Sequence, residues 1–197
     1  MRSLRAALLL SLVAAAEVSA QGRTSPLDRY DPVFRKYTKR YFGIGYDWRL
    51  FKAQGMAESD LTPTAKSRVG ARGVMQLMPS TFAEIRSREP TLRSISDPEW
   101  NIAAGILHDS KLWGLWKEPP EGERRAFMFA SYNAGRRTIL NAQAMARACA
   151  LHPLAWRSIE TIAPQVPRWR HEETLGYVRK IEANMARLGP DGRVIVR

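Results

Sequence analysis

Apolar side chains recur every three or four residues along most of the chain beyond residue 30, and Gly, Pro and Asp residues separate one run from the next. This spacing places the apolar side chains of each run on one face of a helix. The alternation of apolar and polar residues that indicates strands does not stand out in the sequence, and neither do internal repeats. The pattern therefore predicts a mainly α globule with at most a small irregular β region.

The expected helices are separated by short breaks, apart from one longer irregular segment. We expect helices from residue 31 to Gly43, from residue 47 to Asp60, after residues 78–81, after Asp97-Pro98, and over residues 121–132, 137–151, 154–162 and 172–188. Residues 62–73 show little periodicity and contain one proline and two glycines, which predicts a loop or a small hairpin. The last helix has a continuous apolar stripe made of Leu175, Val178, Ile181, Met185 and Leu188.

The first 20 residues have the pattern of an export signal. Arg2 and Arg5 precede an apolar run over residues 6–16, and Val18-Ser19-Ala20 supplies the small residues that a signal peptidase reads. We therefore expect a signal peptide over 1–20, a flexible segment over 21–30, one domain over 31–189 and a tail over 190–197. No cysteine follows the expected cut, so a lipoprotein is not indicated. The expected location is the periplasm or the cell envelope.

The chain is strongly basic, with 31 Lys and Arg residues against 19 Asp and Glu residues and a formal net charge of +12. On charge alone the partner could be nucleic acid, acidic lipid or a bacterial wall polymer. The export signal and the lack of a recognition helix argue against nucleic acid. Beyond residue 20 no segment is long and apolar enough to span a membrane, so we expect no transmembrane segment in the mature chain.

The sequence indicates neither metal nor disulfide chemistry. His108, His152 and His171 show no metal-ligand spacing, either with one another or with the single Cys149. One cysteine cannot form an intramolecular disulfide, and Cys149 lies in an Ala-rich helical stretch where we expect a small buried side chain. We therefore expect no metal and no cofactor.

Glu58 has an unusual place at the end of an expected helix. Phe51, Gln54 and Gly55 share its face at helical spacing, so its carboxylate would point inward or into a cleft. The alternative is a solvated glutamate near a frayed helix end, and spacing alone favours that alternative.

Two further segments combine apolar and hydrogen-bonding side chains. Residues 73–79 contain two methionines and one amide but no charge, which suits either core packing or a pocket wall whose amide binds a sugar. Residues 132–135 place an aromatic hydroxyl beside an amide at a helix end, where Asn and Gly would also suit a helix C-cap.

Five segments in this order carry a resemblance to a known family. They are Glu58-Ser59, Ser67 with residues 70–79, Asn101-Ile102 with Gly105, residues 132–135, and Glu173-Thr174 with Tyr177-Val178. Together they resemble the lytic transglycosylases of bacterial peptidoglycan, in the branch built like the soluble lytic transglycosylase catalytic domain. The resemblance extends from about residue 41 to about residue 184. Residues 46–50 look like the catalytic domain of the membrane-bound F type.

The resemblance implies a lysozyme-like, mainly α fold with a catalytic cleft, and it implies an activity. Enzymes of this family cleave the β-1,4 bond between MurNAc and GlcNAc and leave 1,6-anhydro-MurNAc ends. One glutamate, matched here by Glu58, acts first as the acid and then as the base. Burial would raise the pKa of such a carboxyl toward the working pH. The sequence offers no convincing second carboxylate of the usual glycosidase pair, because Asp60 would point away on a continuing helix.

The resemblance also implies a set of substrate-binding residues, which are Ser67, Met75, Gln76, Met78, Tyr132, Asn133 and Glu173. Ser67 matches a serine near the acetamido group, and we favour this role over the alternative of a hydroxyl that caps its own loop. Gln76 would supply an amide and Met78 an apolar wall. Glu173 matches a buried family glutamate near the cleft, and a first-turn carboxylate that stabilises a helix N-terminus is an equal alternative.

The expected partners are peptidoglycan glycan strands, with an envelope-spanning secretion or motility machine as a further candidate. Two other functions fit the same sequence. A goose-type lysozyme-like hydrolase would use water in place of the sugar's C6 hydroxyl. An exported basic scaffold would bind peptidoglycan without cleaving it, and the clusters of Lys and Arg would then serve attraction to the anionic envelope.

Overall fold

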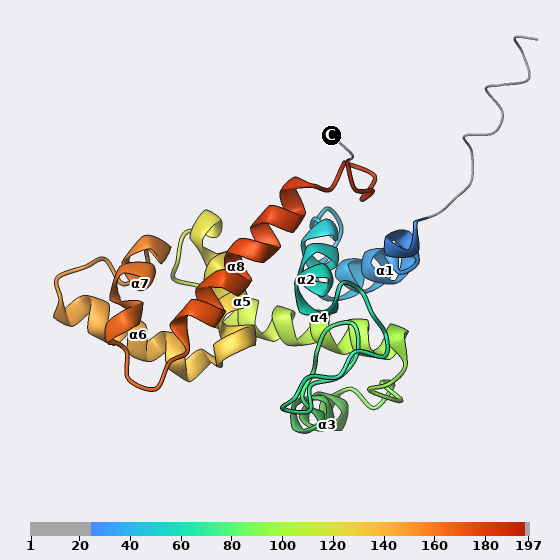
Figure 1. Ribbon diagram of the computed structural model, residues 1–197, viewed down its shortest axis with the longest axis horizontal. Coiled ribbons are helices and arrows are strands. Elements are labelled where there is room, and N and C mark those ends of the chain that lie inside the picture. Colours follow the sequence, from blue (N-terminus) through green and yellow to red (C-terminus); the bar gives the residue numbers. More distant parts are fainter. Residues whose placement is uncertain (1–24, 196–197) are drawn as a thin grey trace, which may run out of the picture.

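The computed structural model describes residues 25–195, so the predicted signal peptide over 1–20 lies outside the described residues. The elements in chain order are η2 (Pro26–Asp28), α1 (Asp31–Phe42), α2 (Arg49–Ser59), α3 (Pro79–Arg88), α4 (Pro98–Leu115), α5 (Glu121–Ala134), α6 (Arg136–Ala148), α7 (Trp156–Ile162), η3 (Ala163–Gln165) and α8 (His171–Ala186) (Figure 1). Over the same residues, extended structure is limited to isolated bridges, two of which lie between residues 66 and 77. The prediction of a mainly α fold with a small irregular β region is confirmed.

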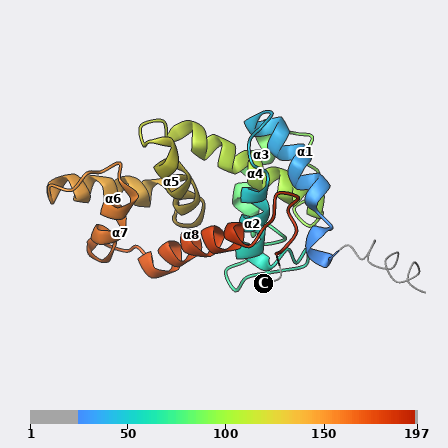
Figure 2. The same ribbon diagram turned by 90° about the horizontal axis from the view of Figure 1, so that it is seen from above.

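The helices form two ends joined by α4, α5 and α8. One end holds α1, α2 and α3, and the other holds α6 and α7 (Figure 1). Helix α4 packs on α1 and α5, and α5 also packs on α6 and α8. Both views show α8 returning from the α7 end toward α2, on which it packs (Figure 2). The return of α8 brings two segments more than a hundred residues apart into contact.

The apolar stripe of α8 explains this return. Leu175, Val178 and Ile181 are each less than a tenth exposed, as the stripe predicted. Cys149, in contrast, is exposed, and the prediction of a buried thiol is wrong. Helix α6 ends at residue 148 rather than 151, because the chain turns into a left-handed conformation at Ala150, so Cys149 lies at the helix end.

The segments on either side of the predicted domain pack against it. Lys52 of α2 is fully buried, and its Nζ lies 2.9 Å from Asp28 and 2.7 Å from Asp31. The same Nζ donates to the carbonyl of Gly192 at 2.8 Å, and Arg49 donates to the carbonyl of Gly189 at 3.0 Å. The predicted boundaries at residues 31 and 189 are therefore too narrow, because polar contacts with no local sequence signal hold both flanking segments.

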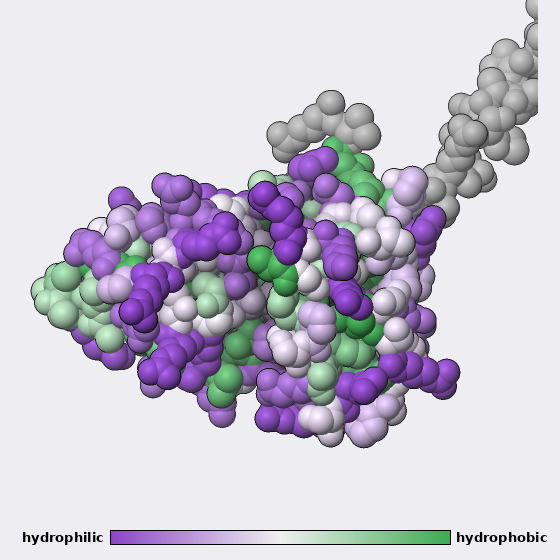
Figure 3. Space-filling view, turned by 60° about the horizontal axis from the view of Figure 1, so that its bottom comes forward, coloured by the Kyte–Doolittle hydropathy of each residue, from purple (hydrophilic) through white to green (hydrophobic). Residues whose placement is uncertain are grey.

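Hydrophilic side chains predominate on the face shown in Figure 3, where hydrophobic residues form small separate areas. Along residues 25–195, no helix combines the length and the apolar character that crossing a membrane needs.

Candidate active site

Glu58 lies in the last turn of α2, where the helix ends abruptly. Asp60 and Leu61 both adopt left-handed backbone conformations and terminate the helix. The Ser59 hydroxyl donates to the carbonyl of Val74 at 2.8 Å, which ties the helix end to the loop that follows. The end of α2 that carries Glu58 is thus held beside residues 73–79, one of the two segments singled out above.

The surroundings of Glu58 make it a strong candidate for proton transfer. Burial raises the pKa of its carboxyl to about 7. The Tyr177 hydroxyl of α8 donates to Oε1 at 2.7 Å, and this bond together with the charge of Lys180 lowers the pKa by less than burial raises it. The residue keeps part of its surface exposed, so a ligand can reach it. Near neutral pH such a group can both release and accept a proton.

A buried amide holds the loop opposite Glu58. Asn101 of α4 is fully buried, and its Oδ1 accepts from the Met75 backbone N–H at 2.8 Å. Its Nδ2 donates to the carbonyls of Arg72 and Ile95, each at 3.0 Å. Gly73 has a φ of +77°, and a Cβ built there would lie 2.5 Å from the same amide, so only glycine fits. Asn101 belongs to the segments that resemble the family, but only the structure shows that its side-chain amide holds this loop.

Tyr132 reaches the same loop from α5. Its hydroxyl donates to the Met75 carbonyl at 2.8 Å, and burial raises its pKa far above the usual value. The charge of Glu58 also raises the pKa of Tyr132, which shows that the two side chains are near neighbours. The structure therefore brings Tyr132, the loop and Glu58 together.

The other predicted residues of this loop have different environments. The Ser67 hydroxyl accepts from the Ala71 backbone N–H at 3.0 Å, which corresponds to the loop-capping alternative and leaves its own hydrogen free. Gln76 has a φ of +43°, and its amide nitrogen donates to the carbonyl of Gly73 at 2.9 Å. Met78 is 38% exposed at the start of α3.

Met75 does not form a cleft wall. Its side chain is fully buried and packs on Gly105 of α4, where a Cβ would lie 2.8 Å from it. The predicted substrate contact of the Met75 side chain is therefore wrong, because the thioether belongs to the core. Its backbone contributes instead, by accepting from Tyr132.

Asn133 and Glu173 lie where α5 meets α8. Asn133 Oδ1 accepts from the Thr174 hydroxyl at 2.9 Å, and Thr174 is buried. The Glu173 side chain is 49% exposed and pairs with Arg170 at 2.7 Å. Of the two alternatives for Glu173, the buried one is wrong and the first-turn carboxylate fits the structure, because the neighbouring threonine takes the inward position in α8. Asn133 thus supports this junction rather than facing Glu58 directly.

Three buried polar residues close to Glu58 were not among the predicted site residues, although Gln54 and Tyr177 already appeared in the sequence patterns. Tyr177 is 8% exposed and makes the hydrogen bond described above. Gln54 lies one turn before Glu58 on α2, and Asp109 lies on α4, both with no exposed surface. Burial raises the pKa of Asp109 far above its usual value. Asp109 shares a helix face with the buried Ile102 and could have been found from that spacing.

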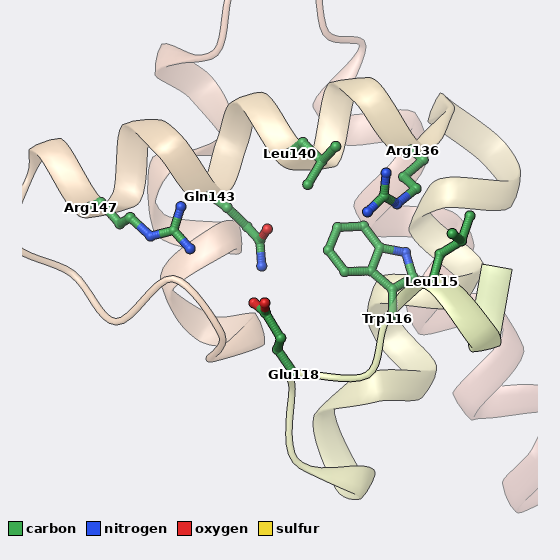
Figure 4. A pocket seen from close by; sticks show the side chains of 7 residues that line it. All are labelled: Leu115, Trp116, Glu118, Arg136, Leu140, Gln143 and Arg147. Atoms are coloured by element: carbon green, nitrogen blue, oxygen red, sulfur yellow. The ribbon is translucent and has the colours of Figure 1, made fainter.

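A separate hollow of about 240 Å³ lies at the other end of the molecule, along one face of α6 (Figure 4). The residues that line it are Leu115, Trp116, Glu118, Arg136, Leu140, Gln143 and Arg147. None of the predicted site residues is among them, so the hollow is distinct from the candidate active site around Glu58.

Residues 33–150 match the family described as the transglycosylase SLT domain, which is more than half of the chain. The chain belongs to the transglycosylase SLT domain family. The resemblance stated from the five sequence segments is thereby confirmed.

Known relatives agree with this membership. The membrane-bound lytic murein transglycosylase F of Shewanella pealeana is 32% identical over 160 residues, which cover 80% of this chain and 31% of that protein. The chain thus spans about a third of the length of the curated relatives it matches. The 70-kDa soluble lytic transglycosylase of Escherichia coli superposes with a TM-score of 0.63 at 25% identity over 80% of this chain and 23% of its own.

A further solved structure supports the fold alone. The lytic transglycosylase Slt of Pseudomonas aeruginosa superposes with a TM-score of 0.63 at 23% identity, over 80% of this chain and 23% of its own. The predicted lysozyme-like helical fold of this family is therefore confirmed.

Proposed function

We propose that the protein is a peptidoglycan lytic transglycosylase that cleaves the β-1,4 bond between MurNAc and GlcNAc and leaves 1,6-anhydro-MurNAc ends. The observation that carries the proposal is Glu58, a partly exposed residue whose buried carboxyl has a pKa raised to about 7 and accepts from Tyr177. The proposed location is the periplasm or cell envelope, where glycan strands are found.

In the first step Glu58 acts as the general acid. Its proton moves to the glycosidic oxygen while the bond from C1 to that oxygen breaks, and the GlcNAc alcohol leaves. A positioned acid of matched pKa contributes about a hundredfold to ten-thousandfold to such a rate. The Tyr177 hydrogen bond and the charge of Lys180 both stabilise the carboxylate that this step creates, because each lowers the pKa of Glu58.

In the second step the Glu58 carboxylate acts as the base. It takes the proton of the C6 hydroxyl of MurNAc, the O6 atom bonds to C1, and the 1,6-anhydro ring closes. The acid is regenerated and no water is consumed. A nucleophile attached to the substrate has a large effective concentration, which makes a second catalytic carboxylate unnecessary.

The acids near Glu58 support this one-carboxylate scheme. Two-carboxylate glycosidases need a second carboxylate about 5 to 10 Å away that reaches the sugar or a water. The charge of Glu58 raises the pKa of Asp109, but Asp109 has no exposed surface, so it cannot reach a substrate. Asp60 is exposed and lies at the left-handed end of α2.

The proposed substrate contacts come from the loop and from the end of α5. The free hydrogen of the Ser67 hydroxyl and the amide oxygen of Gln76 would bind sugar polar groups. Met78 would supply an apolar surface. Tyr132 and Asn133 would form the opposite side of the substrate site. Asn133 would contribute indirectly, through its support of α8.

Digestion of purified sacculi followed by mass spectrometry tests the proposal. We expect muropeptides lighter by one water than hydrolysed ones, and none from the Glu58→Gln variant. Hydrolysed ends would instead indicate a goose-type lysozyme-like activity. Binding of sacculi by the wild-type protein with no products at all would indicate a scaffold and overturn the proposal.

A further inference from the structure

Asp109 is the most unusual ionisable residue that the proposed reaction does not use. It lies on α4 with no exposed surface, and neither of its carboxyl oxygens has a hydrogen-bond partner of standard geometry. A carboxylate in this position would carry an unpaired charge out of water, which costs more than accepting a proton. Among residues 25–195, no Lys, Arg or His is one of the groups that influence its pKa, so this part of the chain supplies no neutralising cation there.

Gln54 offers Asp109 a matching partner. Its amide is fully buried, and both Nε2 and Oε1 lack partners of standard geometry. The same amide is the hydrogen-bonding group that acts on Asp109, and it lowers the pKa of the carboxyl by less than burial raises it. A carboxylic acid can donate its O–H to the amide oxygen and accept from the amide N–H at once, whereas a carboxylate would face the amide oxygen with no hydrogen to give. All four atoms are satisfied together only when the acid is protonated.

We propose that Asp109 is a neutral carboxylic acid that pairs with Gln54 and thereby positions Glu58. Of the two acids, only Glu58 then exchanges protons. The inference rests on the proposed function, which it extends by one positioning residue. Asp109 does not touch the substrate in this scheme. It acts through Gln54, which lies one turn below Glu58 on the same helix face.

The arrangement of the helices shows why such a link matters. Helix α2 packs mainly on α8 and α1, and it has few backbone approaches to α4. A pair between Gln54 of α2 and Asp109 of α4 joins these two helices directly beneath the acid. Fixing that turn fixes the direction of the Glu58 side chain, on which proton transfer depends.

The ionisable groups that face Asp109 are an acid and three phenols. They are Glu58 on α2, Tyr132 on α5, Tyr177 on α8 and Tyr46 in the segment before α2. Burial raises the pKa of every one of these tyrosines, so near neutral pH they carry no charge. A negative charge on Asp109 would raise the pKa of Glu58 beyond about 7 and would leave little carboxylate to act as the base.

The pH dependence of activity distinguishes a neutral Asp109 from a charged one. Asp109→Asn is neutral at every pH and keeps the pairing with Gln54. We expect its alkaline limb to fall at the same pH as that of the wild type, within about half a unit, with a loss of rate of no more than about threefold. A downward shift of about one unit or more would show that a charge had been removed, and would overturn the proposal.

A second set of variants tests the positioning role. Asp109→Leu leaves the Gln54 amide without a partner, and we expect kcat per folded molecule to fall by roughly tenfold or more. The double variant Gln54→Leu with Asp109→Leu removes both polar groups, so stability recovers while kcat stays low. Recovery of kcat together with stability would show that the pair only supports the fold. Glu118→Gln, in the hollow of Figure 4, is the matched surface control.

An infrared difference spectrum between the wild type and Asp109→Asn gives a readout that does not depend on activity. We expect a carboxylic-acid band assigned to Asp109 that persists to about pH 8. Absence of the band would overturn the inference even in an active enzyme. A protein that shows the band but releases no muropeptides would instead refute the proposed function and keep the neutral acid.

Discussion

Helix α2 carries a buried cation near its start and faces buried acids near its end, and the two regions differ in how charge is compensated. The ammonium of Lys52 contacts Asp28, Asp31 and the carbonyl of Gly192, all within 2.9 Å. Asp109, near the other end, has no hydrogen-bond partner of standard geometry. The first region keeps its charge because oxygen atoms replace water around it. In the second region burial outweighs the Tyr177 hydrogen bond and the Lys180 charge, so the pKa values of its acids are raised.

The difference separates stability from chemistry along a single helix. A buried charge that is fully paired gains nothing from moving a proton, and its role is to hold chain segments in place. A carboxyl whose pKa lies near neutral pH can exchange its proton at little cost. The comparison therefore predicts that substitutions at the Lys52 end alter unfolding, and that substitutions at the Glu58 end alter turnover.

The largest effect is expected for Glu58→Gln. The variant keeps the size of the side chain but has no proton to give, so muropeptide release should fall by about a thousandfold or more. Folding should be retained, because a neutral amide is easier to bury than an acid that ionises. Circular dichroism and sacculus digestion measure the two properties. An active Glu58→Gln variant would show that turnover does not depend on the acid at this end of α2.

Lys52→Met should have the opposite effect. Loss of the ammonium leaves the carboxylates of Asp28 and Asp31 buried without their partner, which should lower the free energy of unfolding by about 3–5 kcal/mol. Turnover per folded molecule should stay near that of the wild type, since Lys52 does not contact Glu58. Urea titration gives the first quantity, and activity at low temperature gives the second. A stable but inactive Lys52→Met variant would contradict the division between the two ends.

The pH dependence of stability should sharpen the comparison. The folded pKa of Glu58 is about 7, above the ordinary value of 4.5 for an unfolded chain, so its protonated form stabilises the fold below about pH 4.5. This contribution is lost as the pH rises through about 7 and amounts to about 3 kcal/mol. Relative to Glu58→Gln, the wild type should become less stable across this range. Parallel stability curves for the two proteins would mean that Glu58 is not buried as described.

Tyr177→Phe should shift the proton equilibrium without removing the acid. The hydroxyl lowers the pKa of Glu58, so its loss should raise that pKa by about one unit and move the alkaline limb of activity to higher pH. The rate should fall by roughly tenfold, because the carboxylate of the second step loses its hydrogen bond. A pH profile with the wild-type midpoint would show that Tyr177 does not hold Glu58 in solution.

The fold was largely readable from the sequence because helix signals are local. Asp97 and Pro98 predicted the start of α4, and the Asp97 side chain indeed accepts from the backbone N–H groups of Glu99 and Trp100. These signals need only a few neighbouring residues, so a chain of unknown shape still displays them. The inward position of Glu58 came instead from the resemblance of the five segments, because helical spacing alone favoured a solvated side chain.

The contacts that tune the site could not be read in the same way. Tyr177 reaches Glu58 across 119 positions of the chain, and the partners of Lys52 come from both flanking segments. A polar residue within a helix is most often solvated, so Asp109 gave no signal by residue type alone. Its spacing to Ile102 put it on an apolar helix face, but the packing of α4 against α1 and α5 that buries this face comes from the structure.

Glu173→Gln is expected to have the smallest effect and tests the one acidic residue that was misplaced. Its side chain is 49% exposed and pairs with Arg170, which is 84% exposed, and such pairs contribute little to stability. The first-turn charge of α8 adds at most a small helix-dipole effect, so the free energy of unfolding should change by less than about 0.5 kcal/mol. Turnover should change by less than about twofold, because Thr174 rather than Glu173 holds Asn133. A tenfold loss of turnover in a normally folded Glu173→Gln variant would place this carboxylate in the substrate-binding surface after all. The candidate active site around Glu58 would then extend to the first turn of α8.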